Sequence, residues 1–86
     1  MAVFKVEWKA SVDRDLQKLH PAQISSILKK LESLAVNPTP RGCKKLVETE
    51  RTYRIRVGNY RIIYQVDYPA RIVLVYYIRH RKDAYK

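Results

Sequence analysis

Two runs of alternating polar and apolar residues flank the dipeptide Gly58-Asn59. Because successive side chains of a strand point to opposite faces, each run predicts a half-buried β-strand, over about 51–57 and 60–67. Glycine and asparagine both tolerate the positive φ that a two-residue hairpin turn requires. Such a turn fixes which residues lie opposite one another, so the register of the hairpin can be counted outward from it.

The predicted register divides the hairpin into an apolar face and a basic face. The face suited to a core carries Tyr53, Ile55, Val57, Tyr60, Ile62 and Tyr64, and the other carries Arg54, Arg56, Arg61, Ile63 and Gln65. Arg56 then lies opposite Arg61, and like charges in opposite positions destabilise a sheet. Guanidinium cannot lose its proton to relieve the repulsion, but it matches the geometry of phosphate. We interpret the pair as part of a phosphate site; the alternative is a solvated face whose arginines pair with Glu48, Glu50 or Asp83.

The rest of the chain predicts one strand and two helices before the hairpin and one strand after it. Alternation predicts a strand over 3–9, Ser11 is expected to cap the first helix, and Pro21 suits the first turn of the second. The apolar stripe of that second helix is Ile24, Ile27, Leu28, Leu31 and Leu34. Residues 41–45 form a basic connector. The order β-α-α-β-β-β predicts an α+β fold, one small domain over residues 1–86 with a largely antiparallel sheet and two helices packed on one face.

The last predicted strand spans 71–79 and leads into a basic tail. Strict alternation divides it into one row of Ile72, Leu74, Tyr76 and Ile78 and another of Val73, Val75, Tyr77 and Arg79. The tail would bring His80, Arg81 and Tyr85 to the edge of the sheet. We interpret His80 as a phosphate contact or proton donor, because no second ligand stands at metal spacing from it. His20, before Pro21, is interpreted as a helix-end residue.

The net charge of +10 on 86 residues is unevenly distributed, with eleven Lys/Arg against four Asp/Glu over residues 44–86. Such an excess predicts a polyanionic partner, most often nucleic acid, or an acidic protein; a merely solubilising basic surface is the alternative. The single cysteine, Cys43, excludes an internal disulfide and a cysteine metal cluster, and is interpreted as an incidental small residue. No signal peptide or apolar run of about 20 residues is present, so we expect a cytoplasmic protein without a membrane partner.

The chain lacks the motifs of several common enzyme classes. Only two glycines occur, Gly42 and Gly58, which excludes a glycine-rich phosphate loop. No Ser-His-Asp set or pair of carboxylates stands out either. We therefore expect neither a cofactor nor a metal.

The predicted element order, the run YRIRVGNYRIIYQV (53–66) and the closing IRHRKDAY (78–85) together resemble the RelE/ParE superfamily of bacterial and archaeal toxins over nearly the whole chain. The resemblance implies a toxin of a type II toxin–antitoxin system that a cognate antitoxin neutralises in a hetero-oligomer. The positive charge predicts that this antitoxin is acidic. RelE-type members cleave mRNA in the ribosomal A site, whereas ParE-type members inhibit DNA gyrase, and the fold alone does not decide between them.

The resemblance also implies which residues carry the chemistry. The RelE-type catalytic positions fall on Arg54, Arg56, Arg61, Arg81 and Tyr85, all of compatible types. This favours a metal-independent endoribonuclease whose partners are mRNA and the ribosome, at the A site on its small subunit; the readings as a ParE-like gyrase inhibitor and as a catalytically silent basic module stay open. Family members often carry lysine on the strand pair, and arginine is a poorer proton acceptor, so an electrostatic role is expected here. Additional contacts with RNA phosphates are expected from Lys44, Lys45, His80 and Lys82.

Overall fold

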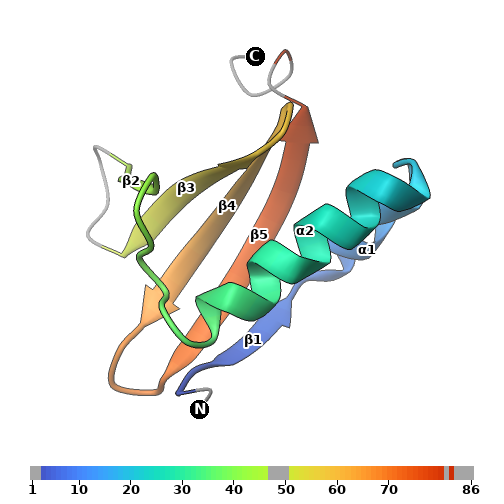
Figure 1. The fold of residues 1–86 in the computed structure, drawn as a ribbon. Coiled ribbons are helices and arrows are strands. Elements are labelled where there is room, and N and C mark those ends of the chain that lie inside the picture. The colour runs from blue at the N-terminus through green and yellow to red at the C-terminus, as the bar shows by residue number, and fades with distance from the viewer. Residues whose placement is uncertain (1–2, 47–50, 81, 83–86) are drawn as a thin grey trace.

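The computed structural model describes residues 3–46, 51–80 and 82. It places them in the order β1 (Lys5–Trp8), α1 (Ala10–Gln17), α2 (Pro21–Leu34), β2 (Lys44–Lys45), β3 (Thr52–Val57), β4 (Tyr60–Asp67) and β5 (Ile72–His80). The strands form one sheet in the order β1-β5-β4-β3-β2 (Figure 1). Strands β2 to β5 pair antiparallel, whereas β1 runs parallel to β5. The predicted α+β fold is confirmed, and β2 forms within the segment interpreted as a connector.

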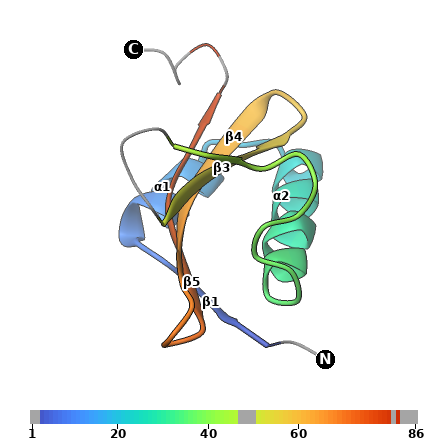
Figure 2. The same cartoon turned by 90° about the vertical axis from the view of Figure 1, so that its left-hand side faces the viewer.

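The core lies between α2 and the sheet, and α2 occupies one side of β3, β4 and β5 (Figure 2). Ile27, Leu31 and Leu34 are buried on α2, while Ile24 and Leu28 at the predicted stripe are only half-buried. Val12 of α1 is fully buried in the same core. Burying a side chain of this size contributes about 1.5–3 kcal/mol, so this apolar face accounts for the position of α2. The strand residues of the core are Ile55, Ile62, Tyr64, Val66, Val73, Val75 and Ile78.

The first turn of α2 is closed by a capping box. His20 precedes the helix, and its Nδ1 accepts a hydrogen bond from the Ala22 N–H at 3.2 Å. In return, Oε1 of Gln23 accepts from the His20 N–H at 3.3 Å. Pro21 occupies the first turn, where its missing N–H leaves no bond unmade. The expectations for His20 and Pro21 are thus confirmed.

The predicted capping role of Ser11 is wrong. Lys9 is the residue that precedes α1, and it makes no side-chain capping bond. Ser11 Oγ instead donates to the Tyr76 carbonyl at 3.0 Å, and Asp15 Oδ2 accepts from the Ile78 N–H at 3.0 Å. Strand β1 last pairs with β5 at Val75, so side chains of α1 satisfy the backbone of β5 beyond that point.

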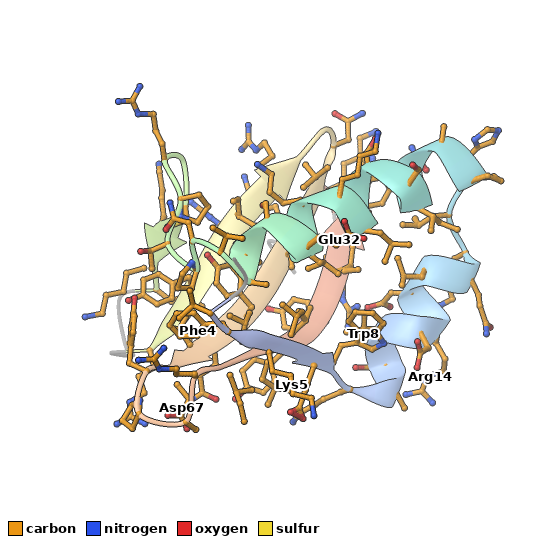
Figure 3. The ribbon with its side chains drawn as sticks, turned by 60° about the horizontal axis from the view of Figure 1, so that its bottom comes forward. Phe4, Lys5, Trp8, Arg14, Glu32 and Asp67 are labelled. Carbon is orange, nitrogen blue, oxygen red and sulfur yellow. The ribbon has the colours of Figure 1, made fainter. Side chains whose placement is uncertain are left out.

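A side-chain hydrogen bond fixes the junction between β1 and α1. The indole Nε1 of Trp8, the last residue of β1, donates to Asp13 Oδ1 of α1 at 3.0 Å (Figure 3). Trp8 is among the exposed large apolar residues, so this bond holds its ring beside the first turn of α1. The contact joins the edge strand to the helix that continues along β5.

The predicted register of the hairpin is confirmed in full, from Val57 opposite Tyr60 to Tyr53 opposite Tyr64. The arginine-bearing side of β3 and β4 is therefore the side opposite α2, which we call the open face. It carries Arg54, Arg56, Arg61, Ile63 and Gln65.

The two predicted rows of the last strand are wrong, because β5 contains a β-bulge. Ile63 pairs with Tyr77 and Tyr64 with Val75, which leaves Tyr76 as an extra residue. Strict alternation would have put Arg79 on the core side and Ile78 on the open face. The extra residue exchanges the faces on which Ile78 and Arg79 lie, so Ile78 is buried in the core. This keeps Arg79 out of the apolar core, where a charge is costly without a partner.

Candidate anion-binding site

Three arginines lie side by side on the open face, one on each of three neighbouring strands. Arg56 of β3 is opposite Arg61 of β4, and the bulge places Arg79 of β5 opposite Arg61 on its other side. Arg79 is the residue that sequence reasoning missed. Strict alternation had grouped it with Val73 and Val75, and a charged residue in a row of core valines is the signal that could have revealed the bulge.

A hollow of about 270 Å³ lies over one end of this row and is lined by Gly42, Lys44, Arg54, Arg56 and Arg61. We call it the cationic pocket. Lys44 of β2 is opposite Arg54 of β3, so the edge strand adds its charge directly beside the hairpin. No carboxylate is among the lining residues that the structure describes. Four cationic side chains from three strands therefore converge on one hollow, and this arrangement favours an anion.

The arginines of the pocket differ in exposure. Arg61 is only 5% exposed, Arg54 is half-buried, and Arg56 and Lys44 are exposed. Buried guanidinium acts in a lower dielectric than water, so its attraction for an anion is stronger and less screened by salt. Arg61 is thus the fixed floor of the pocket, and Arg56 and Lys44 form its accessible rim.

Arg79 is held at the edge of the sheet rather than in the cationic pocket. Its Nη1 lies 2.9 Å from Asp15 Oδ2 of α1, and its guanidinium stacks 4.6 Å from the centre of the Tyr77 ring. Asp15 is the same carboxylate that accepts from the Ile78 N–H. One carboxylate therefore fixes both the backbone at the end of β5 and the third arginine of the row.

The segment that leads from α2 into the connector is held to the core at Pro38. The hydroxyl of Tyr64, which is fully buried, donates to the Pro38 carbonyl at 2.7 Å, and its ring stacks on Tyr53. Burial raises the pKa of Tyr64 well above its ordinary value, so the phenol remains a donor. Cys43, in the same connector, is half-buried against the core.

The other predicted contacts lie elsewhere or outside the described residues. Lys45 is opposite Tyr53 and so lies on the other face from Lys44. His80 is opposite Tyr60 on the α2 side of the sheet, and Lys82 is exposed beyond β5. The described residues do not include Arg81 and Tyr85, nor the acidic residues considered as alternative partners, Glu48, Glu50 and Asp83.

Neither a metal cluster nor a membrane-spanning helix occurs within residues 3–46, 51–80 and 82. In these ranges, no three His, Cys, Asp or Glu side chains gather as a metal site would require. None of the helices there is long and apolar enough to span a membrane.

Known proteins resemble this chain in both sequence and fold. A family model described as the ParE toxin of type II toxin-antitoxin system, parDE, matches residues 6–85. The relative named RelE1 from Methanocaldococcus jannaschii is 34% identical, in an alignment that covers 96% of each chain.

Two solved complexes extend the likeness to three dimensions. The archaeal RelE–RelB complex from Pyrococcus horikoshii has a chain with a TM-score of 0.85 and 28% identity, covering 94% of this chain and 98% of that one. The toxin–antitoxin complex RelBE2 from Mycobacterium tuberculosis gives 0.80 and 29%, with 96% and 97% covered. Since the family model spans nearly the whole sequence and the relatives match over nearly their full length, the chain belongs to the ParE-toxin family, within the RelE/ParE superfamily of toxins of type II toxin–antitoxin systems.

Proposed function

We propose that this toxin is a ribosome-dependent endoribonuclease that cleaves mRNA in the ribosomal A site and so inhibits translation. The observation that carries the proposal is the cationic pocket, where Arg54, Arg56 and Arg61 converge with Lys44. A phosphodiester gains negative charge in the transition state of cleavage. Fixed cations aimed at that charge lower the barrier, and removal of one such group typically costs about 10²–10³ in kcat.

The reaction that fits these residues is transesterification within the RNA. The 2′-OH attacks the adjacent phosphorus, the bond to the 5′-oxygen breaks, and a cyclic phosphate and a free 5′-hydroxyl result. We assign Arg56 and Arg61 to the phosphate oxygens, with Arg54 in support. Tyr85, as its phenolate, would accept the proton of the 2′-OH, or as the phenol would orient it while water takes the proton. Arg81 would stabilise the leaving 5′-oxygen, which takes up a proton from water to become the hydroxyl. Of the described residues that line the pocket, four are arginine or lysine cations, and none is a carboxylate or a histidine that could act as the base.

The weakness of the available base explains why the ribosome is required. Arginine stays protonated in proteins, so it stabilises charge without accepting a proton. Alignment of the 2′-OH with the phosphorus must then supply much of the rate, and such alignment is worth up to about 7–11 kcal/mol. The mRNA held in the A site would provide it, whereas free RNA should be a poor substrate.

The partner in the resting state is a cognate antitoxin. Two solved relatives are RelE–RelB or RelBE complexes, and their chains match this one over nearly their whole length. The net charge of +10 on this toxin predicts an acidic antitoxin, because opposite charges favour association. We propose that it covers the cationic pocket and neutralises the toxin in a hetero-oligomer.

Inhibition of DNA gyrase is the second candidate function, because the matching family model is named for ParE. In that case the arginines of the open face would bind a protein or DNA without cleaving RNA. The two functions give different experimental results. An endoribonuclease cuts translated mRNA, whereas a gyrase inhibitor blocks supercoiling and leaves cleaved DNA.

Primer extension on an mRNA translated in a cell extract tests the proposal. Wild-type toxin should cut within codons at the A site, and only when the mRNA is translated. Arg56→Gln should cut at least tenfold more slowly, whereas Arg14→Gln, the same change at an exposed position on α1, should cut as the wild type does (Figure 3). If Tyr85→Phe and Arg81→Ala both cut as well as the wild type, the roles given to these two residues are wrong.

A further inference from the structure

The guanidinium of Arg79 has a different environment from the arginines of the cationic pocket. Its Nη1 is paired with Asp15 Oδ2 at 2.9 Å and also donates to the Ile78 carbonyl at 3.2 Å. By contrast, no carboxylate is among the described residues that line the cationic pocket. Because Asp15 offsets its charge, Arg79 attracts an incoming phosphate less strongly than an unpaired guanidinium would. A phosphate contact therefore explains the first two arginines of the row better than it explains the third.

The flat surface of the guanidinium is the part of Arg79 that a ligand can use. Its Cζ lies 4.6 Å from the centre of the Tyr77 ring, so that ring covers one face. Asp15 takes one edge, since a guanidinium donates hydrogen bonds in its own plane. The side chain is still 41% exposed. The group is thus held in a fixed orientation from one face and one edge, while a large part of it stays accessible.

A hollow of about 640 Å³ lies beside Arg79, between α1 and the end of β5. Ligand sites for small organic groups have volumes of about 300–1,000 Å³ and combine apolar walls with a few polar groups. This hollow has both kinds of wall. Apart from the ion pair of Asp15 and Arg79, the described residues that line it are Lys18, Leu19, Tyr60, Ile78 and His80. A flat ring with a polar edge, such as a nucleobase, fits that chemistry.

The hollow is close to the cationic pocket because Arg79 and Arg61 are opposite one another on neighbouring strands. β3, β4 and β5 lie side by side in the sheet (Figure 1). With about 4.7–4.9 Å between strands, β5 is about 5 Å from the strand of Arg61 and about 10 Å from that of Arg56. These spacings are comparable to the dimensions of one nucleotide. An RNA whose phosphate lies in the cationic pocket can therefore place an adjoining base on Arg79.

We propose that the guanidinium of Arg79 is a stacking platform for a base of the RNA. Proteins bind single-stranded RNA by stacking its splayed bases on aromatic rings and on the planes of arginine guanidiniums. Here Tyr77 supports the platform from one face and Asp15 fixes its plane, so both are positioning residues. The proposal rests on the proposed function and deepens it: the cationic pocket binds the phosphate, and Arg79 binds a neighbouring base.

The substitution Arg79→Lys separates the flat group from the charge. Lysine keeps the positive charge and an ammonium that can pair with Asp15, but it has no plane on which a base can stack. Arg14→Lys, the same change at an exposed position on α1, is the matched control. Two ligands separate bases from phosphates: a fluorescein-labelled RNA hexamer of adenosines, and a labelled hexamer of the same charge in which every ribose lacks its base.

Fluorescence anisotropy at fixed salt measures the affinity of each protein for each hexamer. Stacking of one base is worth about 1–3 kcal/mol, which is about 5- to 150-fold in Kd. Arg79→Lys should therefore bind the adenosine hexamer about 5- to 150-fold more weakly than the wild type does. It should bind the base-free hexamer as the wild type does, and Arg14→Lys should match the wild type on both. Because binding is measured without cleavage, the result does not depend on catalytic activity.

Two substitutions of Tyr77 test the support of the platform. Tyr77→Phe keeps the ring beneath the guanidinium, whereas Tyr77→Leu removes it. The phenylalanine variant should bind both hexamers as the wild type does, and the leucine variant should lose affinity for the adenosine hexamer alone. An equal loss in the two variants would assign the effect to the hydroxyl and contradict the stacking arrangement, and unchanged affinity in both would contradict it as well.

Other results overturn the proposal as a whole. An equal loss on both hexamers in Arg79→Lys would assign Arg79 to the phosphates, and no loss on either would leave it a purely structural residue. A wild type that binds neither hexamer at low salt, or both equally well, would show that no base is held. The proposed function fails separately, if the wild type cuts no translated mRNA, and the two hexamers then still decide whether Arg79 stacks on a base.

Discussion

Replacing Arg56 with glutamine should make the protein more stable than the wild type in chloride and less stable than the wild type in phosphate. Arg56 is exposed on the rim of the cationic pocket and lies directly opposite Arg61. In chloride alone, the substitution removes a like-charge pair and leaves the polar surface of the strand intact. In phosphate, it removes one of the cations that bind the anion.

The expected magnitudes follow from these two roles. Relief of an opposed like-charge pair should stabilise the variant in chloride by roughly 0.2–1 kcal/mol. In phosphate at 100 times the dissociation constant, the wild type should gain about 2.7 kcal/mol, which raises Tm on the order of 10–20 °C for a domain of this size. Loss of one charge-assisted contact weakens binding by roughly 1.5–3 kcal/mol, so the variant should forfeit most of that gain.

Urea unfolding of wild type, Arg56→Gln and Arg14→Gln, in low millimolar phosphate or in chloride of equal ionic strength, measures the effect. Arg14 is exposed on α1, away from the pocket, and controls for the change in net charge. We predict that Arg56→Gln is more stable than the wild type in chloride and less stable in phosphate, while Arg14→Gln responds to phosphate as the wild type does. An equal phosphate gain in wild type and Arg56→Gln would refute the assignment of Arg56 to an anion site.

Three further predictions concern the supports of the site and its partner. Asp15→Ala should lower the free energy of unfolding in urea by about 1–3 kcal/mol with an unchanged m-value, because it leaves the Ile78 N–H without its acceptor and releases Arg79. Tyr64→Phe should lose about 1–3 kcal/mol at neutral pH, because the Pro38 carbonyl loses its buried donor. Burial raises the pKa of Tyr64, so as the pH rises the phenol ionises in the unfolded chain before it does so in the folded protein. The stability that the neutral phenol gives is therefore complete below pH ~10 and falls above it. Tyr64→Phe should show a shallower alkaline decline of the free energy of unfolding in unfolding titrations. Association with an acidic antitoxin should slow sharply between about 0.1 and 1 M salt in stopped-flow experiments, with dissociation less affected, and a salt-independent association rate would contradict the proposed charge complementarity.

The hairpin could be predicted from the sequence because one local feature determines it. A two-residue turn at Gly58-Asn59 permits a single register, and the alternation on both sides then assigns every side chain to a face. Gly58 has φ +57°, as such a turn requires. The convergence of Arg54, Arg56 and Arg61 followed from that count alone.

The bulge could not be predicted in the same way, because tertiary packing decides it. The run from Ile72 to Ile78 is apolar on both rows, so alternation fits either register of β5 equally well. Only the neighbouring strand and the core select the one that buries Ile78 and places Arg79 on the open face. Arg79 in a row with core valines is a sign of the irregularity, but only the folded chain places it as the third arginine of the row.

The role of Ser11 was missed for a related reason. Serine is a common residue before a helix, so the sequence pattern favoured a cap. The edge of β5 beyond Val75 offers a free carbonyl at Tyr76, and that long-range partner takes the hydroxyl instead. Local propensity identified the start of the helix to within a residue or so but not the bond that the side chain makes.

Cleavage mapping on translated mRNA, run beside a gyrase supercoiling assay with the same protein preparations, tests the central claim most directly. We predict A-site cuts by the wild type, none by an Arg56→Gln, Arg61→Gln double variant that still folds, and no effect of either protein on supercoiling. Inhibited supercoiling by the wild type, with intact mRNA, would contradict the proposed function and assign the cationic pocket to a different target.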